Sequence, residues 1–228
     1  MRAWRGRRQR PSLRSLYHHL VRALGPQHWW PAKSPFEVMV GAILTQNTAW
    51  VNVERAIAQL EAAHALSART LARRPSTAIQ RLIRPSGYFR QKAAVLQGFS
   101  RWHLKRYQGS TRAMFRTPAR RLRQELLGLK GIGPETADSI LLYAGRRPTF
   151  VIDAYTRRIF QRHHLISGRE PYDETQRFCL DRLPRRVQLY NEFHALLVAV
   201  GKRYCHRTDP DCASCPLGKF PHHIEVHA

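Results

Sequence analysis

Apolar residues recur along most of this chain at intervals of three or four positions, the spacing that places them on one face of an α-helix. Leu13, Leu16, Leu20 and Leu24 form one such stripe. The alternation of apolar and polar residues that marks a β-strand is nearly absent. The pattern predicts further helices over residues 50–64, 67–74, 76–84, 90–106, 118–127, 134–145, 153–163, 172–182 and 187–202. The chain is therefore predicted to be all-α.

One more predicted helix has a clear start signal and is apolar on most of its faces. Ser34 is a suitable N-cap, Pro35 suits the first turn, and Glu37 completes a capping box. The helix then continues from Val38 to Leu44 with apolar residues on nearly all sides. Because such a helix must be covered by its neighbours, we expect it to lie at the centre of the fold.

Two glycines, Gly131 and Gly133, interrupt the helical pattern and predict a tight turn between two helices. Glycine permits backbone angles that other residues resist, and it lets a nucleic-acid backbone approach closely. The second helix then presents free N–H groups and a positive dipole end to a phosphate. Asp153 follows in the apolar segment 150–153. A phosphate-binding turn with a lone carboxylate indicates chemistry at a deoxyribose; the alternative is an ordinary helix turn and a surface aspartate.

The charge balance indicates the partner. The 228 residues include 39 Lys and Arg against 15 Asp and Glu, a formal net charge of +24. This excess is far larger than solubility requires and favours a polyanion. Arginine dominates the basic set and suits phosphate contacts. The alternative is a general basic bias that merely solvates the surface.

The densest basic block lies in residues 1–12, which we predict to be a disordered arm. This arm lacks the apolar core of a secretory signal. No apolar run approaches the length of a membrane span. We therefore expect a soluble cytoplasmic protein, associated with the nucleoid, with no membrane partner. The sequence gives no sign of an oligomer, so we expect a monomer.

Two motifs carry a family resemblance. Leu-x-Gly-Ile-Gly-x-x-Thr-Ala begins at Leu129, and Val-Ile-Asp-Ala-Tyr-Thr-Arg-Arg begins at Val151. Together they resemble the helix-hairpin-helix (HhH-GPD) superfamily of DNA glycosylases, whose best-known branch is endonuclease III. The 3-methyladenine DNA glycosylase III branch is the one most similar to segments 29–31, 36–37, 41–48, 84–88 and 91–93. The resemblance extends from about residue 13 to 217.

The resemblance implies two helical lobes with damaged double-stranded DNA bound across the cleft. One lobe is a six-helix barrel over residues 37–147 that contains the hairpin. The other combines residues 13–36 with 148–228 and includes an iron–sulfur-like, cysteine-rich loop at 205–221. Asp153 would then lie at the mouth of the cleft.

The resemblance also implies a mechanism. Endonuclease III-type enzymes that cut the strand carry a lysine two residues after the second hairpin glycine, where this chain has Glu135. A carboxylate cannot form the Schiff base that leads to strand cleavage. Neither Lys130 nor Lys92 occupies the matching position. We therefore predict a monofunctional glycosylase in which Asp153 activates water or stabilises the oxocarbenium-like charge. Glu135 either positions water or is only a favourable acid at a helix N-terminus.

The resemblance places base-stacking aromatic residues at Trp29, Trp30 and Trp50. An alkylated purine such as 3-methyladenine is cationic, and electron-rich rings attract it. The alternative is that Trp29 and Trp30 only fill space between the lobes. The base must leave the duplex to reach such a pocket. Residues implied to contact the DNA are Gln46, Asn47, Tyr88, Lys130, Gly131, Gly133 and Thr136.

Three of the four cysteines lie close together near the C-terminal end. Cys205, Cys212 and Cys215 match the first three ligands of the [4Fe–4S] loop of endonuclease III. The fourth ligand of that loop falls at Pro221 here, next to His222 and His223. A zinc site of three Cys and one His, or a loop without metal, are the alternatives.

Other functions stay open at this point. Cys179 lies within a predicted helix and is expected in the core, and a disulfide framework is not expected. A helix-hairpin-helix module that only binds DNA is one rival, but it would have no use for an acid such as Asp153 in a positive cleft. A glycosylase with lyase activity, or one acting on mismatched thymine, uracil or adenine, are the others.

Overall fold

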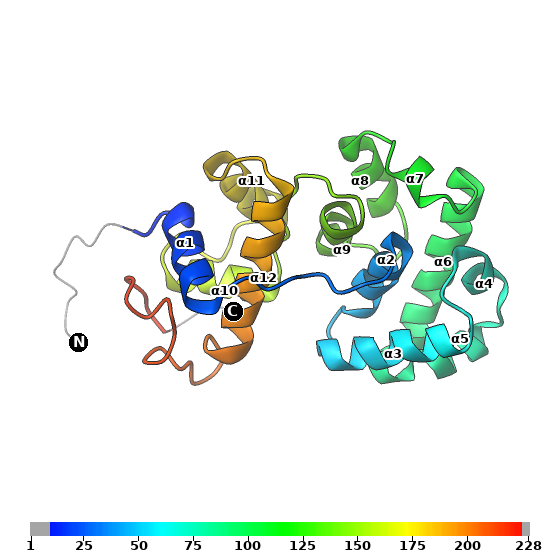
Figure 1. Ribbon diagram of the computed structural model, residues 1–228, viewed down its shortest axis with the longest axis horizontal. Helices are drawn as coiled ribbons and strands as arrows, with labels where there is room; N and C mark the ends of the chain where they lie inside the picture. Colours follow the sequence, from blue (N-terminus) through cyan, green and yellow to red (C-terminus); the bar gives the residue numbers. More distant parts are fainter. Residues whose placement is uncertain (1–9, 225–228) are drawn as a thin grey trace. The chain divides into compact units, whose positions relative to one another are not determined.

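The computed structural model describes residues 10–224 and shows an all-α fold in which this range contains no strand (Figure 1). The prediction of an all-α chain is confirmed. Residues 1–9 of the predicted basic arm lie outside the described residues. Within the described range, no helix combines the length and apolar character that crossing a membrane requires. The α-helices are α1 (Leu13–Leu24), α2 (Pro35–Leu44), α3 (Trp50–Ala62), α4 (Ala68–Arg73), α5 (Ser76–Leu82), α6 (Phe89–Tyr107), α7 (Thr111–Met114), α8 (Ala119–Leu127), α9 (Pro134–Ser139), α10 (Ala154–Arg162), α11 (Tyr172–Arg182) and α12 (Val187–Arg203).

Two shorter elements complete the fold. The 3₁₀-helix η1 (Arg84–Ser86) precedes α6, and the π-helical turn η2 (Ile140–Ala144) continues α9. The chain forms two compact units, each described separately below. The terminal unit combines the residues up to Trp29 with those from Pro148 onward, and the central unit is Trp30–Arg147.

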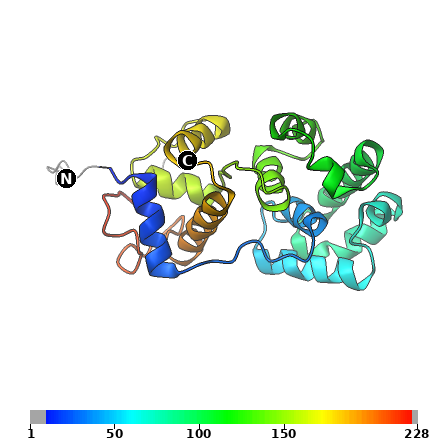
Figure 2. The same cartoon turned by 45° about the horizontal axis from the view of Figure 1, so that its top comes forward.

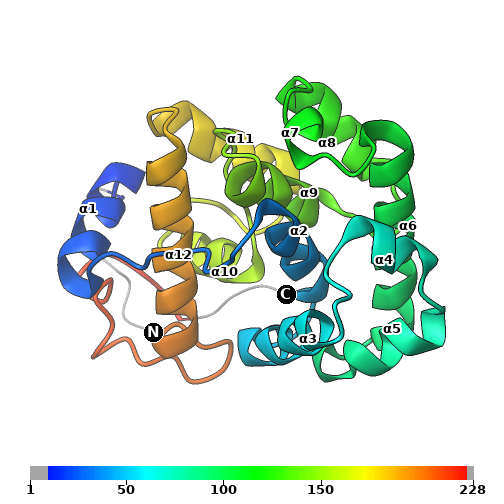
Figure 3. The ribbon, with the colours of Figure 1, turned by 45° about the vertical axis from the view of Figure 1, so that its right-hand side comes forward.

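The terminal unit is organised around α12. This helix contacts α10 on one side and α1 on another, as Figure 3 shows. Leu16 and Leu20 of α1 are fully buried, which accounts for the leucine stripe in the sequence. Phe193 of α12 contacts Phe150 with ring centroids 5.8 Å apart. Packed aromatic pairs of this kind add to the burial of apolar area, so these rings form the core beneath the segment that leads to Asp153.

The central unit is organised around α2. Every residue of this helix from Glu37 to Leu44 is buried. It contacts α3, α6, α9 and η2, so it is covered by neighbours on several sides (Figure 2). The Ser34 hydroxyl accepts from the Glu37 amide at 3.2 Å, and the Glu37 carboxylate accepts from the Lys33 amide at 2.8 Å. The central position and the Ser34 cap that the sequence predicts are confirmed. The capping box is only partly formed, because the Glu37 carboxylate accepts from the residue before the N-cap and not from the Ser34 amide.

Candidate functional site

The glycine turn lies between α8 and α9 and requires its glycine at position 131. Gly131 has φ +86°, and a Cβ at that position would collide with the Val95 side chain of α6. Gly133 is the N-cap of α9, Pro134 is its first residue, and Glu135 lies in its first turn. Lys130 and both glycines are exposed, and Thr136 is buried. The turn therefore presents backbone to solvent immediately ahead of a helix N-terminus, which suits a phosphate.

Gln46 ties the loop after α2 to this turn. Its side-chain amide donates to the Gly131 carbonyl at 3.1 Å and to the Thr136 hydroxyl at 2.8 Å. The next residue, Asn47, is exposed and has a left-handed backbone with φ 52°. The structure thus joins Gln46 to residues 85 and 90 positions further along the sequence, all of which were predicted to contact DNA.

Three aromatic rings form a cluster in the central unit. Trp30 packs edge-on against Trp50 with centroids 4.9 Å apart, and it lies 5.2 Å from the Tyr143 ring of η2. A Cβ on Gly41 would come within 2.9 Å of the Trp30 ring, so α2 is close to this indole because residue 41 is a glycine. The Trp50 indole donates to Glu54 at 2.8 Å. The sequence predicts Trp30 and Trp50 as base-stacking residues, and the structure adds Tyr143 to the same cluster.

The remaining aromatic candidate, Trp29, belongs to the terminal unit. Tyr88 of the central unit is the N-cap of α6, has a left-handed backbone with φ 44°, and is 65% exposed. Gly87 before it has φ 66°. A large aromatic side chain held out into solvent on a two-residue left-handed turn is an unusual feature that points to an external contact.

Asp153 is the N-cap of α10 in the terminal unit. One carboxylate oxygen accepts from the Thr156 amide at 2.7 Å. The other oxygen lies 3.6 Å from Nε2 of His194, which is buried in α12. Burial lowers the pKa of His194, and the charge of Asp153 opposes that shift. The carboxylate is therefore fixed in place beside an imidazole whose pKa is lowered by burial. His194 was missed from the sequence, where it reads as one polar residue in an apolar helix.

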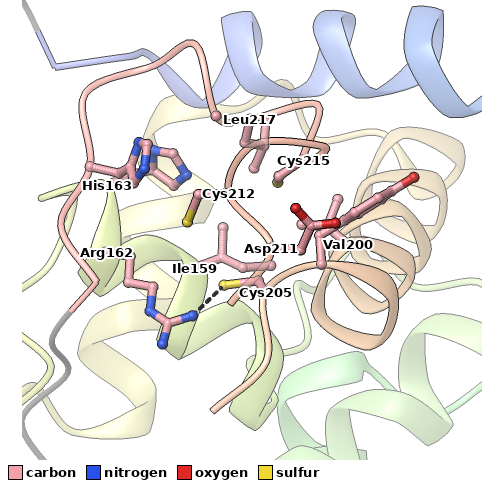
Figure 4. A pocket seen from close by; sticks show the side chains of 12 residues that line it. Ile159, Arg162, His163, Val200, Cys205, Asp211, Cys212, Cys215 and Leu217 are labelled. Carbon is pink, nitrogen blue, oxygen red and sulfur yellow. Dashed lines mark hydrogen bonds between the residues drawn. The ribbon is translucent and has the colours of Figure 1, made fainter. Parts of the chain in front are cut away.

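The three clustered cysteines line one pocket of the terminal unit (Figure 4). Arg162 of α10 donates to the Cys205 sulfur at 3.1 Å, as the dashed line in Figure 4 shows. Burial raises the pKa of the Cys212 thiol and of the Cys215 thiol. His163 also lines the pocket, and burial lowers its pKa to about 4. Cys179 lies in α11, away from these residues, and is fully buried, as a core cysteine is.

This pocket does not fit a cluster held by four cysteines. The position of the fourth ligand is Pro221, whose carbonyl accepts from Nδ1 of His163 at 3.0 Å. The cavity has a volume of about 20 Å³, room for little more than one water molecule. Across residues 10–224, no three His, Cys, Asp or Glu side chains are arranged to hold a metal ion. The [4Fe–4S] cluster at Cys205, Cys212 and Cys215 stays a prediction.

Comparison with known proteins decides the family. The model of the HhH-GPD superfamily of base excision DNA repair proteins matches residues 40–185. The chain belongs to the HhH-GPD superfamily. The match includes the Gln46 loop, the Tyr88 turn, the glycine hairpin and Asp153, so the HhH-GPD assignment rests on the segments that carry the candidate site.

Individual relatives support the assignment to the HhH-GPD superfamily. A putative DNA repair glycosylase of Methanocaldococcus jannaschii is 42% identical over 207 residues, 90% of this chain and 93% of the relative. The crystal structure of Helicobacter pylori 3-methyladenine DNA glycosylase bound to 1,N6-ethenoadenine is 31% identical, with a TM-score of 0.71 over 84% of this chain and 94% of that one. A non-covalent endonuclease III–DNA complex has a TM-score of 0.79 over 92% and 93% of the two chains at 20% identity, which shows the shared fold.

Proposed function

We propose that this protein is a monomeric DNA N-glycosylase that removes an alkylated purine such as 3-methyladenine from double-stranded DNA by hydrolysis, without cutting the strand. The observation that carries the proposal is Asp153, a carboxylate fixed on the N-terminus of α10 in a member of a base excision repair family. In this role Asp153 activates water or stabilises the positive charge that develops on the sugar as the base leaves.

The substrate class is supported by the aromatic cluster and by one relative. Trp30, Trp50 and Tyr143 offer several electron-rich rings in one place. Such rings favour a cationic base over a neutral one through cation–π attraction. The Helicobacter pylori relative is a 3-methyladenine DNA glycosylase captured with a modified adenine, 1,N6-ethenoadenine. A cationic alkylpurine also has a weakened glycosidic bond, so a single carboxylate suffices for the chemistry.

The monofunctional mechanism is supported by the positions of Lys92 and Lys130 and by the absence of a lysine at position 135. Glu135 stands where a Schiff-base lysine is required, and it has no amine. Lys92 is buried, and its amine donates to two backbone carbonyls, so it is not available to attack a sugar. Lys130 is exposed on the hairpin turn and precedes both glycines. We assign it to phosphate contact.

Methylated duplex DNA is the substrate that tests this proposal. We expect the purified protein to release free 3-methyladenine, measured by chromatography, and to leave abasic sites that break only after alkali. Strand breaks without alkali would instead show a lyase. Release only from mismatched or oxidised DNA would keep the glycosylase and remove the alkylpurine assignment. DNA binding without release of any base would favour a silent binding module.

Iron and sulfide analysis of anaerobically purified protein tests the cluster prediction. A protein that binds a [4Fe–4S] cluster at the three cysteines would contain iron and absorb visible light, and the Cys212→Ser variant would lose both. Cys179→Ser is the matched control, because this cysteine is buried in α11 and would keep the iron. Colourless protein without iron would show that the three cysteines hold no cluster.

A further inference from the structure

Lys92 is a lysine inside the central unit. It lies near the start of α6 and is only 3% exposed. It shares a helical face with Leu96 and Phe99, which are also buried. Its ammonium donates to the Leu44 carbonyl at 2.8 Å and to the Ser86 carbonyl at 2.6 Å. Both acceptors are backbone atoms, so this cation holds main chain in place.

Both carbonyls lie at helix C-termini, where a cation is favourable. Leu44 is the last residue of α2 and Ser86 is the last residue of η1. Carbonyls in the last turn of a helix lack an intrahelical donor, and a cation at that end is favoured by the helix dipole. The ammonium of Lys92 therefore caps two helices that are separate in the sequence.

Burying an ammonium costs free energy, because the group loses its water and protein hydrogen bonds replace that water only in part. Desolvation lowers the pKa of Lys92 to about 8, which shows that the interior disfavours the charge. An apolar side chain of similar length would fill the same space without this penalty. The fold keeps the lysine in spite of the penalty, which points to a requirement for the two carbonyl contacts.

Both capped ends lead directly into segments proposed to contact DNA. Leu44 is followed by the loop with Gln46 and Asn47, and Ser86 is followed by Gly87 and Tyr88. The Tyr88 turn is conformationally demanding, since both of its residues have positive φ. Such a turn persists only when surrounding structure holds it. Lys92 supplies that support by donating a hydrogen bond to the carbonyl of Ser86, the residue just before the turn.

We propose that Lys92 is a positioning residue for base flipping. Its ammonium fixes the Tyr88 turn at a set distance from the end of α2, so that Tyr88 and the Gln46–Asn47 loop meet the DNA together as the base leaves the stack. Gln46 extends the same framework to the glycine hairpin through its own two hydrogen bonds. This inference rests on the glycosylase function proposed above, and it assigns a role that the family match by itself does not.

The test compares Lys92→Met with wild type on methylated duplex under single-turnover conditions. Methionine keeps most of the length and volume of the side chain and removes both hydrogen bonds. We expect base release to slow on the order of 10²-fold, the effect of misplacing a group by about 1 Å. Affinity for undamaged duplex stays unchanged. Lys105→Met is the matched control, because Lys105 is exposed on the same helix, and it is expected to behave as wild type. Thermal unfolding verifies that each variant is folded, and Lys92→Gln is the second variant if methionine is not accommodated.

Two readouts separate positioning from a general structural role. In the Asp153→Asn background, a fluorescent base analogue beside the lesion reports unstacking, and we expect Lys92→Met to abolish that signal. A double variant with Tyr88→Ala is the second readout. If Lys92 acts through the Tyr88 turn, the double variant is no slower than the slower single variant, whereas independent effects would multiply.

The outcomes keep the two proposals apart. A wild-type protein that releases base, together with a folded Lys92→Met variant that releases it equally fast, overturns the inference and leaves the glycosylase intact. Multiplying effects with Tyr88→Ala also overturn it. A wild type that releases no base from any damaged duplex removes the proposed function itself.

Discussion

Replacing Asp153 with asparagine will lower the rate of base release by about 10²- to 10⁴-fold and leave the fold intact. The side-chain oxygen of asparagine can still accept from the Thr156 amide, and asparagine is as good an N-cap as aspartate. The substitution therefore removes the charge and little else. What is lost is stabilisation of the positive sugar and activation of water, both of which need an anion. Single-turnover release of 3-methyladenine, with thermal unfolding in parallel, measures both parts of the expectation.

Binding of DNA is expected to remain equal or become tighter in this variant, since an acid facing phosphates is repelled by them. Asp181→Asn is the control, because Asp181 is exposed on α11 and the same single charge is removed. Its activity should match that of wild type. A variant at Asp153 that keeps full activity would show that the carboxylate is only a helix cap.

Helices were predictable where local rules decide them. The start of α2 depends on contacts between residues three or four positions apart, such as Ser34 with Glu37, and the sequence shows these directly. The helix predicted over 134–145 is present, but it changes to a π-helical turn at Ile140. A single buried π-helical turn and a buried α-helical turn are built from the same types of apolar residue. The hydrophobic pattern therefore does not distinguish them.

The site was predictable only where a motif marks it. The hairpin glycines and Asp153 stand in motifs that imply a function. Lys92 lies in a segment that carries the resemblance, but that segment gives it no role, and His194 lies in no motif. Both are polar residues on buried helix faces, and their partners lie far away in the sequence: Leu44 is 48 residues from Lys92, and Asp153 is on a different helix from His194. The sequence did offer one signal for both residues. Each is a polar side chain at a helix position where the apolar period predicts a buried, apolar one.

The largest effect on stability is expected at Asp138. Its carboxylate has no exposed surface, and Arg123 of α8 donates to it through Nε at 2.9 Å and through Nη2 at 3.0 Å. Replacing Asp138 with alanine leaves the guanidinium without its bidentate acceptor, and removing one partner of such a pair costs about 3–5 kcal/mol of the free energy of unfolding. Urea denaturation followed by circular dichroism measures that change.

Two further variants show whether the loss belongs to the pair. Arg121→Ala breaks an exposed ion pair with Glu125 one turn along the same helix, and such pairs contribute about 0–1 kcal/mol. Replacing Arg123 and Asp138 together with methionine and leucine removes both charges, so most of the lost stability should return. If the double replacement is as unstable as Asp138→Ala, the loss comes from packing around α9 rather than from an unpaired charge. The buried pair also bears on function, because α9 follows directly on the glycine turn. Arg123 and Asp138 hold in place the helix whose N-terminus is proposed to contact the phosphate.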